Sequence, residues 1–266
     1  MGAANSSSGR KVIALEGRLK GCRNVLTLGV QPDFSGYPPE AAEMIRRADK
    51  IYYPSTFYAD LFNAVGKATF PSYHTYKFVQ DKIRQTALFN LLELPHPRTR
   101  IFFGRQGRAK IPSLFTYPFI AKIPRGSAMG RGVFLIRNPD ELAAYCRETR
   151  IAYIQEYLPC DRDIRVVIIG DDIVHAYWRI AAPGEFRSNV AIGAAISLAP
   201  VPAEACDLAL QTARRCGWND VGIDICACRG RFFLLEANMK YGKEGFRQAG
   251  IDYLQLMERL IDDGKI

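Results

Sequence analysis

Two apolar runs joined by a tight turn place the strongest constraint on how this chain can fold. Residues 221–228 read VGIDICAC, residues 231–238 read RFFLLEAN, and Arg-Gly lies between them. Runs rich in β-branched and aromatic residues favour strands, and a short link containing glycine is typical of an antiparallel hairpin. The sequence therefore predicts an antiparallel pair of strands that is apolar along most of its length.

Three oxygen-bearing side chains interrupt this hairpin, namely Asp224, Glu236 and Asn238. Residues two apart in a strand face the same side, so Glu236 and Asn238 point together. Asp224 joins them if it lies opposite Glu236, which requires the three-residue loop 229–231 or a bulge with the same effect. A two-residue turn alone would place Asp224 opposite Leu235 and turn Glu236 to the other face.

These oxygens predict a metal site. Mg²⁺ prefers hard oxygen ligands and keeps several waters and substrate phosphates, and Mn²⁺ accepts the same ligands. Two uncompensated carboxylates among Ile, Phe and Leu would cost several kcal/mol, roughly, which a cation would offset. The alternative is a pair of salt-bridged surface carboxylates, followed by an asparagine that helps the next turn.

A glycine-rich stretch in the middle of the chain, IAKIPRGSAMGRGV, predicts a phosphate-binding loop. Lys122 lies on an expected strand just before Gly126, Gly130 and Gly132. Glycines let a loop lie close over a polyanion with its N–H groups directed at it, and lysine adds a point charge. A second strand follows the glycines instead of a helix, so this is not a Rossmann turn. A plain hairpin turn is the alternative.

Two further segments suit nucleotide chemistry. In IQEYLPCDRDIR, an apolar strand ends at Glu-Tyr-Leu-Pro, where backbone groups could meet a flat heterocycle and Asp163 a ribose hydroxyl. An edge strand with a charged loop is the alternative. In EFRSNVAIGA, Arg187 could bind a phosphate bidentately, and Arg165 could join it in neutralising a transferring phosphoryl group.

Composition narrows the partners. The formal charge is +9, from 36 Lys and Arg against 27 Asp and Glu, which suits nucleic acid, an acidic substrate or a polyphosphate. The basic residues occur singly or in pairs, and neither zinc-finger spacing nor interleaved stacking aromatics are found, so we expect no nucleic-acid partner. Seven cysteines without a C-x-x-C pair and three dispersed histidines favour thiols in a reducing cytosol over a Cys or His metal centre.

The sequence predicts a cytoplasmic protein without a membrane segment. No run of about 18 uncharged apolar residues occurs, and the opening MGAANSSSGR lacks the apolar core of a secretory signal. Gly2 and Ser6 match the myristoylation pattern. The alternative, which we favour, is a disordered lead-in over residues 1–10.

The order of the predicted elements divides the rest of the chain. Residues 11–80 form a small α/β unit that opens with the strand NVLTLGV and continues with a helix from Pro39 and a helix closed by Gly66. Residues 81–150 hold the glycine loop, and residues 151–266 hold the candidate metal site and a long helix over 203–216. The predicted fold class is α/β with two α+β halves rich in antiparallel strands.

The order and spacing of these segments resemble the ATP-grasp superfamily, and within it the RimK-like ligases, which join an amino acid to a carboxylate. The segments that carry the resemblance span residues 81 to 251 and are DKIRQTALFNLLELPHPRT, IAKIPRGSAMGRGV, IQEYLPCDRDIRVVIIGDDIVHAYWR, GEFRSNVAIGA and VGIDICACRGRFFLLEAN. The resemblance implies an ATP-grasp fold, in which two α+β subdomains sandwich the nucleotide behind a small α/β pre-ATP-grasp domain.

The resemblance also implies a role for individual residues. Lys82 and Lys122, together with the loop residues Gly126, Ser127, Gly130 and Gly132, would contact the phosphates of ATP. Glu156, Tyr157 and Leu158 would line the adenine, and Asp163 would bind the ribose. Arg187 and Asn189 would face the transferred phosphoryl group and the nucleotide, with Arg165 nearby, and Asp224, Glu236 and Asn238 would bind Mg²⁺.

The implied reaction is amide formation through an acylphosphate, with release of ADP and phosphate. The substrates would be a small carboxylate and an amine, the amine being an amino acid or a peptide or protein terminus, and an oligomer is compatible with the fold. A phosphotransferase and a non-catalytic nucleotide-binding regulator are the alternatives. The chain departs from the family after Asn238, where Met239, Lys240 and Tyr241 replace a small residue and Pro-Gly, so we expect this loop to choose its own substrate.

Overall fold

The computed structural model describes residues 11–124, 132–188, 190 and 193–266. Packing divides the chain into two compact units, residues 1–77 with 242–266 and residues 78–241. The sequence analysis assigned residues 242–266 to the second ATP-grasp subdomain. The structure differs, because the side chains of this segment pack with the N-terminal unit.

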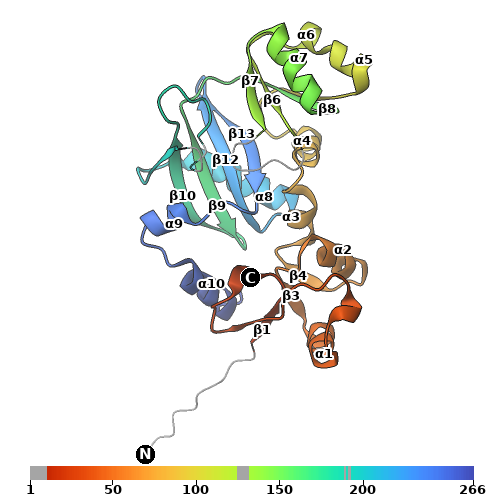
Figure 1. The fold of residues 1–266 in the computed structure, drawn as a ribbon. Helices are drawn as coiled ribbons and strands as arrows, with labels where there is room; N and C mark the ends of the chain where they lie inside the picture. Colours follow the sequence, from red (N-terminus) through yellow and green to blue (C-terminus); the bar gives the residue numbers. More distant parts are fainter. Residues whose placement is uncertain (1–10, 125–131, 189, 191–192) are drawn as a thin grey trace, which may run out of the picture. The chain divides into compact units, whose positions relative to one another are not determined.

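The N-terminal unit is built on a four-stranded parallel sheet with the order β2-β1-β3-β4 (Figure 1). Its elements are β1 (Val12–Ala14), β2 (Val25–Thr27), α1 (Pro39–Arg47), β3 (Lys50–Tyr52), α2 (Thr56–Ala64), β4 (Ala68–Phe70) and α3 (Tyr73–Phe78), with short 3-10 turns at Gly17–Leu19 and Phe34–Gly36. The helix from Pro39 is confirmed. The predicted opening strand, NVLTLGV, contains β2, the second strand of the unit. The sequence does not predict β1, because three residues are too few to show a periodic pattern.

The C-terminal segment completes this unit with α9 (Glu244–Gln248) and α10 (Tyr253–Asp262). Arg23 donates from Nη2 to Oε2 of Glu258 at 2.9 Å. The hydroxyl of Tyr52 donates to the carbonyl of Ile266 at 2.7 Å. Residues more than 200 positions apart in the sequence are therefore hydrogen-bonded within one unit.

The second unit contains two antiparallel sheets. The first has the order β5-β8-β6-β7, formed by β5 (Thr99–Phe103), β6 (Phe119–Lys122), β7 (Val133–Ile136) and β8 (Ile151–Glu156). The helices α5 (Gly104–Ala109), α6 (Ile111–Leu114) and α7 (Pro139–Glu148) gather beside this sheet, as Figure 1 shows. A buried cluster that includes Phe102, Phe119 and Ile154 fills the space between helices and strands.

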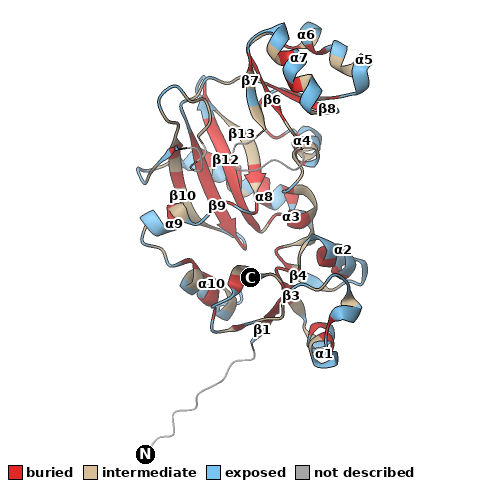
Figure 2. Ribbon diagram, viewed as in Figure 1, coloured by how far each residue is buried: buried red, intermediate tan, exposed pale blue. Residues whose placement is uncertain are grey.

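The second sheet has the order β11-β10-β9-β12-β13. Its strands are β9 (Arg162–Ile169), β10 (Asp172–Ile180), β11 (Ala195–Ser197), β12 (Asp220–Cys228) and β13 (Arg231–Asn238). The helix α8 (Ala203–Cys216) packs against β9, β10, β12 and β13, and it confirms the predicted helix. The buried red core of Figure 2 runs along β9 and β12, where Ile164, Val166, Ile223 and Ile225 are fully covered.

The hairpin of β12 and β13 has the register that the metal-site prediction required. Asp224 pairs with Glu236, which confirms that both lie on one face. The loop is not the three-residue one: Arg229 and Gly230 form a two-residue turn with φ values of 51° and 70°, as a type I′ turn requires. A bulge between Asp224 and Ile225 restores the register, because one extra residue, Leu235, is inserted in β13.

Among the described residues, none of the helices combines the length and the apolar character that crossing a membrane requires.

Candidate functional site

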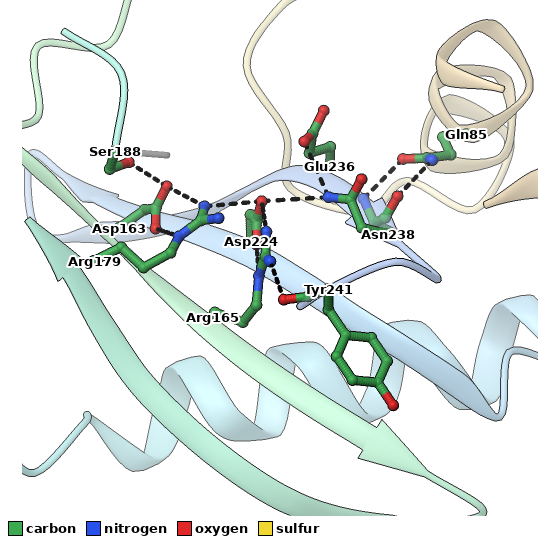
Figure 3. Close-up of polar contacts among 10 residues, drawn as sticks. Gln85, Asp163, Arg165, Arg179, Ser188, Asp224, Glu236, Asn238 and Tyr241 are labelled. Carbon is green, nitrogen blue, oxygen red and sulfur yellow. Dashed lines mark hydrogen bonds and ion pairs between the residues drawn. The ribbon is translucent and has the colours of Figure 1, made fainter. Parts of the chain in front are cut away.

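A buried carboxylate held by two arginines forms the centre of the candidate site (Figure 3). Arg165 on β9 donates from Nε and Nη2 to the two oxygens of Asp224, both at 2.7 Å. Arg179 on β10 approaches Oδ2 of Asp224 to 2.9 Å. Asp224 is only 2% exposed, so its negative charge is compensated by guanidinium groups rather than by water.

Arg179 connects this centre to Asp163. Its Nε and Nη2 atoms lie 2.7 and 2.6 Å from the two carboxylate oxygens of Asp163, and the Ser188 hydroxyl donates to the same carboxylate. Burial alone would lower the pKa of Arg179, but the charges of Asp163 and Asp224 outweigh burial and raise it. Asp163 is 3% exposed, so in this structure it holds Arg179 rather than lying open in a loop. Its contact with a ribose stays a prediction.

Glu236, Asn238 and two lysines form the more open side of the site. Asn238 donates from Nδ2 to Oε1 of Glu236 at 3.0 Å and reaches Oδ2 of Asp224 at 3.5 Å. Lys82, the first residue of α4 (Lys82–Leu91), lies 3.5 Å from Oε2 of Glu236. Burial would raise the pKa of Glu236, but Lys82, Lys122 and the amide of Asn238 together lower it to about 2. Glu236 therefore keeps its negative charge.

Lys122 ends β6 in the other sheet and is buried, with its Nζ atom 5.7 Å from the centre of the Tyr153 ring. Burial lowers the pKa of Lys122, while the charge of Glu236 acts in the opposite direction. The two lysines predicted to contact phosphates therefore both act on the same carboxylate. A buried cation without a bound anion is costly, so this position suits an anionic ligand.

Gln85 supports the candidate site, and sequence reasoning did not identify it. Its side-chain Nε2 donates to the carbonyl of Ala237 and its Oε1 accepts from the Ala237 N–H, both at 2.9 Å. Ala237 lies between Glu236 and Asn238 on β13, which is an edge strand. The amide of Gln85 thus replaces the missing neighbouring strand and fixes the backbone that carries two candidate metal ligands.

The loop after Asn238 is anchored by its tyrosine. The Tyr241 carbonyl accepts from Nη1 of Arg165 at 2.8 Å, and its hydroxyl donates to Oδ1 of Asp220 at 2.7 Å. Met239 and Tyr241 are 6% and 2% exposed. Of the residues Met239, Lys240 and Tyr241, only Lys240 is exposed. The prediction that this loop selects the substrate therefore now applies to the Lys240 side chain.

The remaining predicted residues lie around this centre. Gly132 has a φ of 73° and accepts from the Ile123 N–H at 2.7 Å, which closes the base of the glycine turn. Glu156 ends β8, and its side chain accepts from the Arg98 N–H at 2.6 Å. Tyr157 and Leu158, which are predicted to line the adenine, follow β8 directly. Gly126, Ser127, Gly130 and Asn189 lie outside the described residues.

Arg187 is held locally by an acidic neighbour. Its Nη2 atom lies 2.7 Å from Oε2 of Glu185, and its Nε atom donates to Oε1 at 3.0 Å. This pairing lowers the pKa of Glu185 to about 2. The next residue, Ser188, links this segment to Asp163 by a hydrogen bond from its hydroxyl to the carboxylate. A role of Arg187 at the transferred phosphoryl group stays a prediction.

The donor set at the hairpin fits a hard divalent cation. Asp224 and Glu236 supply carboxylate oxygens, and half a turn of the Asn238 amide would exchange its nitrogen for its oxygen. Among the described residues, Oδ1 of Asp224 accepts from Arg165 alone, which leaves a lone pair for a further ligand. No group of three or more His, Cys, Asp and Glu side chains suited to a metal occurs in the part of the chain that the structure describes, so the site would rest on two carboxylates and one amide.

One sequence signal could have identified Arg179. It is a charged residue in the apolar run HAYWRIA, facing the strand that carries Asp163. A regular two-residue turn at Gly170 and Asp171 would have paired Asp163 with Trp178. A bulge between Ile173 and His175 shifts the register by one residue and pairs Asp163 with Arg179. Gln85 gave no such signal, since its partner is a backbone 152 residues away.

Comparison with known sequences identifies relatives of this arrangement. The profile of the RimK-like ATP-grasp domain matches residues 79–261. The chain is 30% identical over 194 residues to a probable alpha-L-glutamate ligase 1 of Shewanella frigidimarina, covering 69% of this chain and 63% of that protein. It is 35% identical over 152 residues to the ribosomal protein bS6–L-glutamate ligase of Escherichia fergusonii, covering 54% and 50%. The chain thus spans less than two thirds of either relative's length.

Solved structures share the fold at low sequence identity. The RimK domain ATP-grasp protein from Sphaerobacter thermophilus superposes with a TM-score of 0.70 at 15% identity, covering 94% of this chain and 98% of that one. The D-alanine–D-alanine ligase of Bacillus anthracis, in complex with ATP, gives 0.66 at 14% identity, covering 90% and 84%. The fold is therefore the ATP-grasp fold, and with the matched profile it follows that the chain belongs to the RimK-like ATP-grasp family.

Proposed function

We propose that this protein is an ATP-dependent carboxylate–amine ligase that forms an amide bond and releases ADP and phosphate. One observation carries the proposal: the oxygen donors of Asp224, Glu236 and Asn238 gather on one face of the β12–β13 hairpin, and two lysines, Lys82 and Lys122, act on Glu236. Oxygen ligands for a metal ion, with lysine side chains next to them, suit the phosphates of a nucleotide that carries Mg²⁺.

In this proposal each residue has a definite task. Glu236, Asn238 and Asp224 would hold Mg²⁺, which when bound would neutralise charge on the phosphates. Lys82 and Lys122 would contact the phosphate oxygens. Arg165 and Arg179 hold the Asp224 carboxylate in place, at distances of 2.7 to 2.9 Å.

The proposed chemistry needs no general base beyond the substrates. A substrate carboxylate attacks the γ-phosphate of ATP, which gives an acylphosphate and ADP. The uncharged amine then attacks the acyl carbon, the bond from that carbon to the phosphate oxygen breaks, and the departing phosphate takes up the proton that the amine loses. The buried position of Lys122 excludes water around its ammonium, so its charge acts strongly on the developing phosphoryl negative charge.

The substrate class is an amino acid added to a carboxylate. The relatives named above are glutamate ligases, one of which acts on ribosomal protein bS6, and this supports glutamate as the first amine to test. We also propose a cytoplasmic location, for which the seven cysteines, all present as thiols, provide the support.

The test is a screen for ADP release with ATP, Mg²⁺, amino acids and peptides, together with mass spectrometry of the products. We expect an amide product and one ADP for each bond formed. ADP release with a phosphorylated product and no amide would support a phosphotransferase instead. Nucleotide binding without any turnover would support a regulatory protein.

Two variants test the site assignments. Glu236→Gln should abolish Mg²⁺-dependent turnover, and Lys122→Ala should reduce turnover by about two orders of magnitude or more, as the loss of one charge-stabilising group does elsewhere. Glu40→Gln and Lys11→Ala, both at exposed positions, are the matched controls. Unchanged turnover in Glu236→Gln would exclude the metal assignment, and unchanged turnover in Lys122→Ala would exclude the phosphate assignment.

A further inference from the structure

The positive charge of the chain is concentrated in one segment. From Leu94 to Pro139 there are 46 residues without a single Asp or Glu, and nine of them are Lys or Arg. Residues 81–150 hold thirteen Lys and Arg against five Asp and Glu, a formal charge of +8, whereas the whole chain has +9. Residues 81–150 therefore carry most of the charge excess of the chain.

Several of these cations already have internal roles. Lys122 belongs to the candidate site. Arg98 donates from Nη1 to the Leu114 carbonyl at 2.9 Å and stacks 4.4 Å from the centre of the Phe115 ring. Arg108 donates from Nη1 to the carbonyls of Cys146 and Thr149 at 2.6 and 2.9 Å. Lys122, Arg98 and Arg108 thus account for three of the nine Lys and Arg residues in this segment.

Three others are exposed on β5 and the helices that follow it. They are Arg100 within β5, Arg105 in the first turn of α5, and Lys110 between α5 and α6. None of the three forms an ion pair with any residue that the structure describes. A Cβ built on Gly107 would lie 3.8 Å from the Phe102 backbone, so the middle of α5 lies beside the end of β5.

The strand β5 lies at the edge of its sheet, with β8 as its neighbour. Arg98 and Glu156 exchange hydrogen bonds across these two strands. Backbone groups alternate in an antiparallel pair, so Arg100 and Phe102 also face β8. The N–H and C=O groups of Thr99 and Ile101 and the N–H of Phe103 face away from it. No described strand pairs with that side of β5, and the Phe103 side chain at its end is 62% exposed.

We propose that an acidic, extended polypeptide segment binds to this edge by adding a strand to β5. Its backbone would pair with Ile101 and Phe103, since Thr99 is only 8% exposed. Its carboxylates would pair with Arg100, Arg105 and Lys110. We call these five residues the β5 edge surface. Open strand edges recognise peptides in this way, and side-chain charges set the specificity.

The geometry favours a polypeptide over a nucleic acid. An open edge offers alternating donors and acceptors at the spacing of a peptide backbone, which a phosphodiester chain cannot match. In an added strand, alternate side chains face one side about 7 Å apart, so a sequence with an acidic residue at every second position fits three neighbouring cations. The inference goes beyond the proposed function and does not rest on it, because the surface shares no residue with the candidate active site.

The test uses the full chain without ATP and a dye-labelled peptide of about ten residues that alternates Glu and Thr, followed by fluorescence anisotropy. A peptide that alternates Gln and Thr is the uncharged control, and a single-stranded oligonucleotide of equal charge is the nucleic-acid control. We expect the Glu peptide to bind about tenfold or more tighter than both controls and to weaken as salt screens the charges. Equal binding of the Gln peptide, or tighter binding of the oligonucleotide, would overturn the proposal.

Variants locate the binding. The triple variant Arg100→Ala, Arg105→Ala, Lys110→Ala should weaken the Glu peptide about tenfold or more. The matched control is Arg46→Ala, Arg47→Ala, Arg214→Ala, which removes the same charge from other exposed positions. Equal weakening in both would show a response to net charge alone and would overturn the assignment to β5.

Backbone pairing is tested separately with a Glu-Thr peptide that is N-methylated at every second residue. This peptide keeps its charge but loses one row of donors, and it should bind about tenfold more weakly. Unchanged binding would exclude strand addition. The triple variant should keep wild-type ADP release with small substrates, so a failure of the proposed enzyme activity and a failure of this proposal would be seen in different assays.

Discussion

Two guanidinium groups meet one carboxylate at Asp224, and the second of them, Arg179, also holds Asp163 in a bidentate pair. All four side chains of this network, including Arg165, are at most 7% exposed. A buried network is stable only while every charge keeps its partner. Single residues in it should therefore have large effects.

Arg179→Met should destabilise the protein by about 3 kcal/mol or more, because Asp163 would be left as a buried charge without its partner. The measurement is the free energy of unfolding in urea. The double variant Asp163→Leu, Arg179→Met is the control, and it should recover much of the loss because both members of the pair are replaced by apolar groups. A single variant as stable as the wild type would contradict the assigned role.

Gly222→Ala should destabilise the protein by about 1 to 3 kcal/mol, as overpacked core positions do. A Cβ on Gly222 would lie 2.5 Å from Cβ of Tyr241, and that atom cannot move without shifting the backbone that Arg165 holds. The matched control is Gly17→Ala, where an added Cβ meets nothing within 4 Å. Equal unfolding midpoints for the two variants would show that the loop after Asn238 yields easily.

At the scale of elements, the edge strand β13 depends on α4. Gln85 is 3% exposed and satisfies both the N–H and the C=O of Ala237. Its Nε2 also donates to the Val79 carbonyl at 2.5 Å. One side chain therefore fixes the strand that carries Glu236 and Asn238.

Gln85→Ala should lower the stability by about 2 kcal/mol, because three backbone groups, the N–H and C=O of Ala237 and the C=O of Val79, lose their partner. It should also raise the Mg²⁺ concentration needed for half-maximal turnover, since Glu236 and Asn238 lose their fixed spacing. Gln80→Ala is the matched control, because Gln80 is exposed and, within the described part of the chain, its side chain bonds to the sulfur of Met239 alone, at 3.4 Å. A Mg²⁺ dependence that stays the same in Gln85→Ala would contradict a positioning role.

The docking of α10 should be sensitive to acid. The side chain and the backbone N–H of Arg23 hold the pKa of Glu258 below its usual range. A carboxyl with a lowered pKa stabilises the fold above its ordinary pKa of about 4.3, and this stability is lost as the pH falls through the lowered value. Unfolding midpoints of wild type and Glu258→Gln should therefore differ at neutral pH and converge in acid. A gap that is independent of pH would contradict this.

At the scale of the whole molecule, the chain leaves the N-terminal unit at Lys77 and returns to it at Gly242. The second unit is thus a continuous segment, whereas the first is closed by the C-terminal helices. Its sheet has short strands of three residues, which provide little stability by themselves.

Removal of residues 252–266 should therefore loosen the N-terminal unit more than the second unit. Tyr52 and Arg23 would lose their partners Ile266 and Glu258. Hydrogen exchange should show faster exchange in β1 to β4 and little change in β9 and β12. Equal protection of β1 to β4 with and without α10 would show that the N-terminal unit is stable without the C-terminal segment.

The sequence by itself determined the hairpin, the long helix over 203–216 and the shared face of Glu236 and Asn238, because these follow from local periodicity and from residue chemistry. Resemblance in motif order identified the family that the comparisons established. Short elements such as β1 were not predictable, since three residues show no period.

Only the tertiary structure decided which charges meet. The β9–β10 and β12–β13 hairpins each have a two-residue turn, followed by a bulge that shifts the strand register by one residue. No local pattern in the sequence reveals where the extra residue is inserted. Those shifts pair Asp163 with Arg179 and Asp224 with Glu236. Gln85 and the C-terminal helix likewise find partners more than 150 residues away. Long-range pairing depends on packing, so it is fixed only when the whole chain is folded.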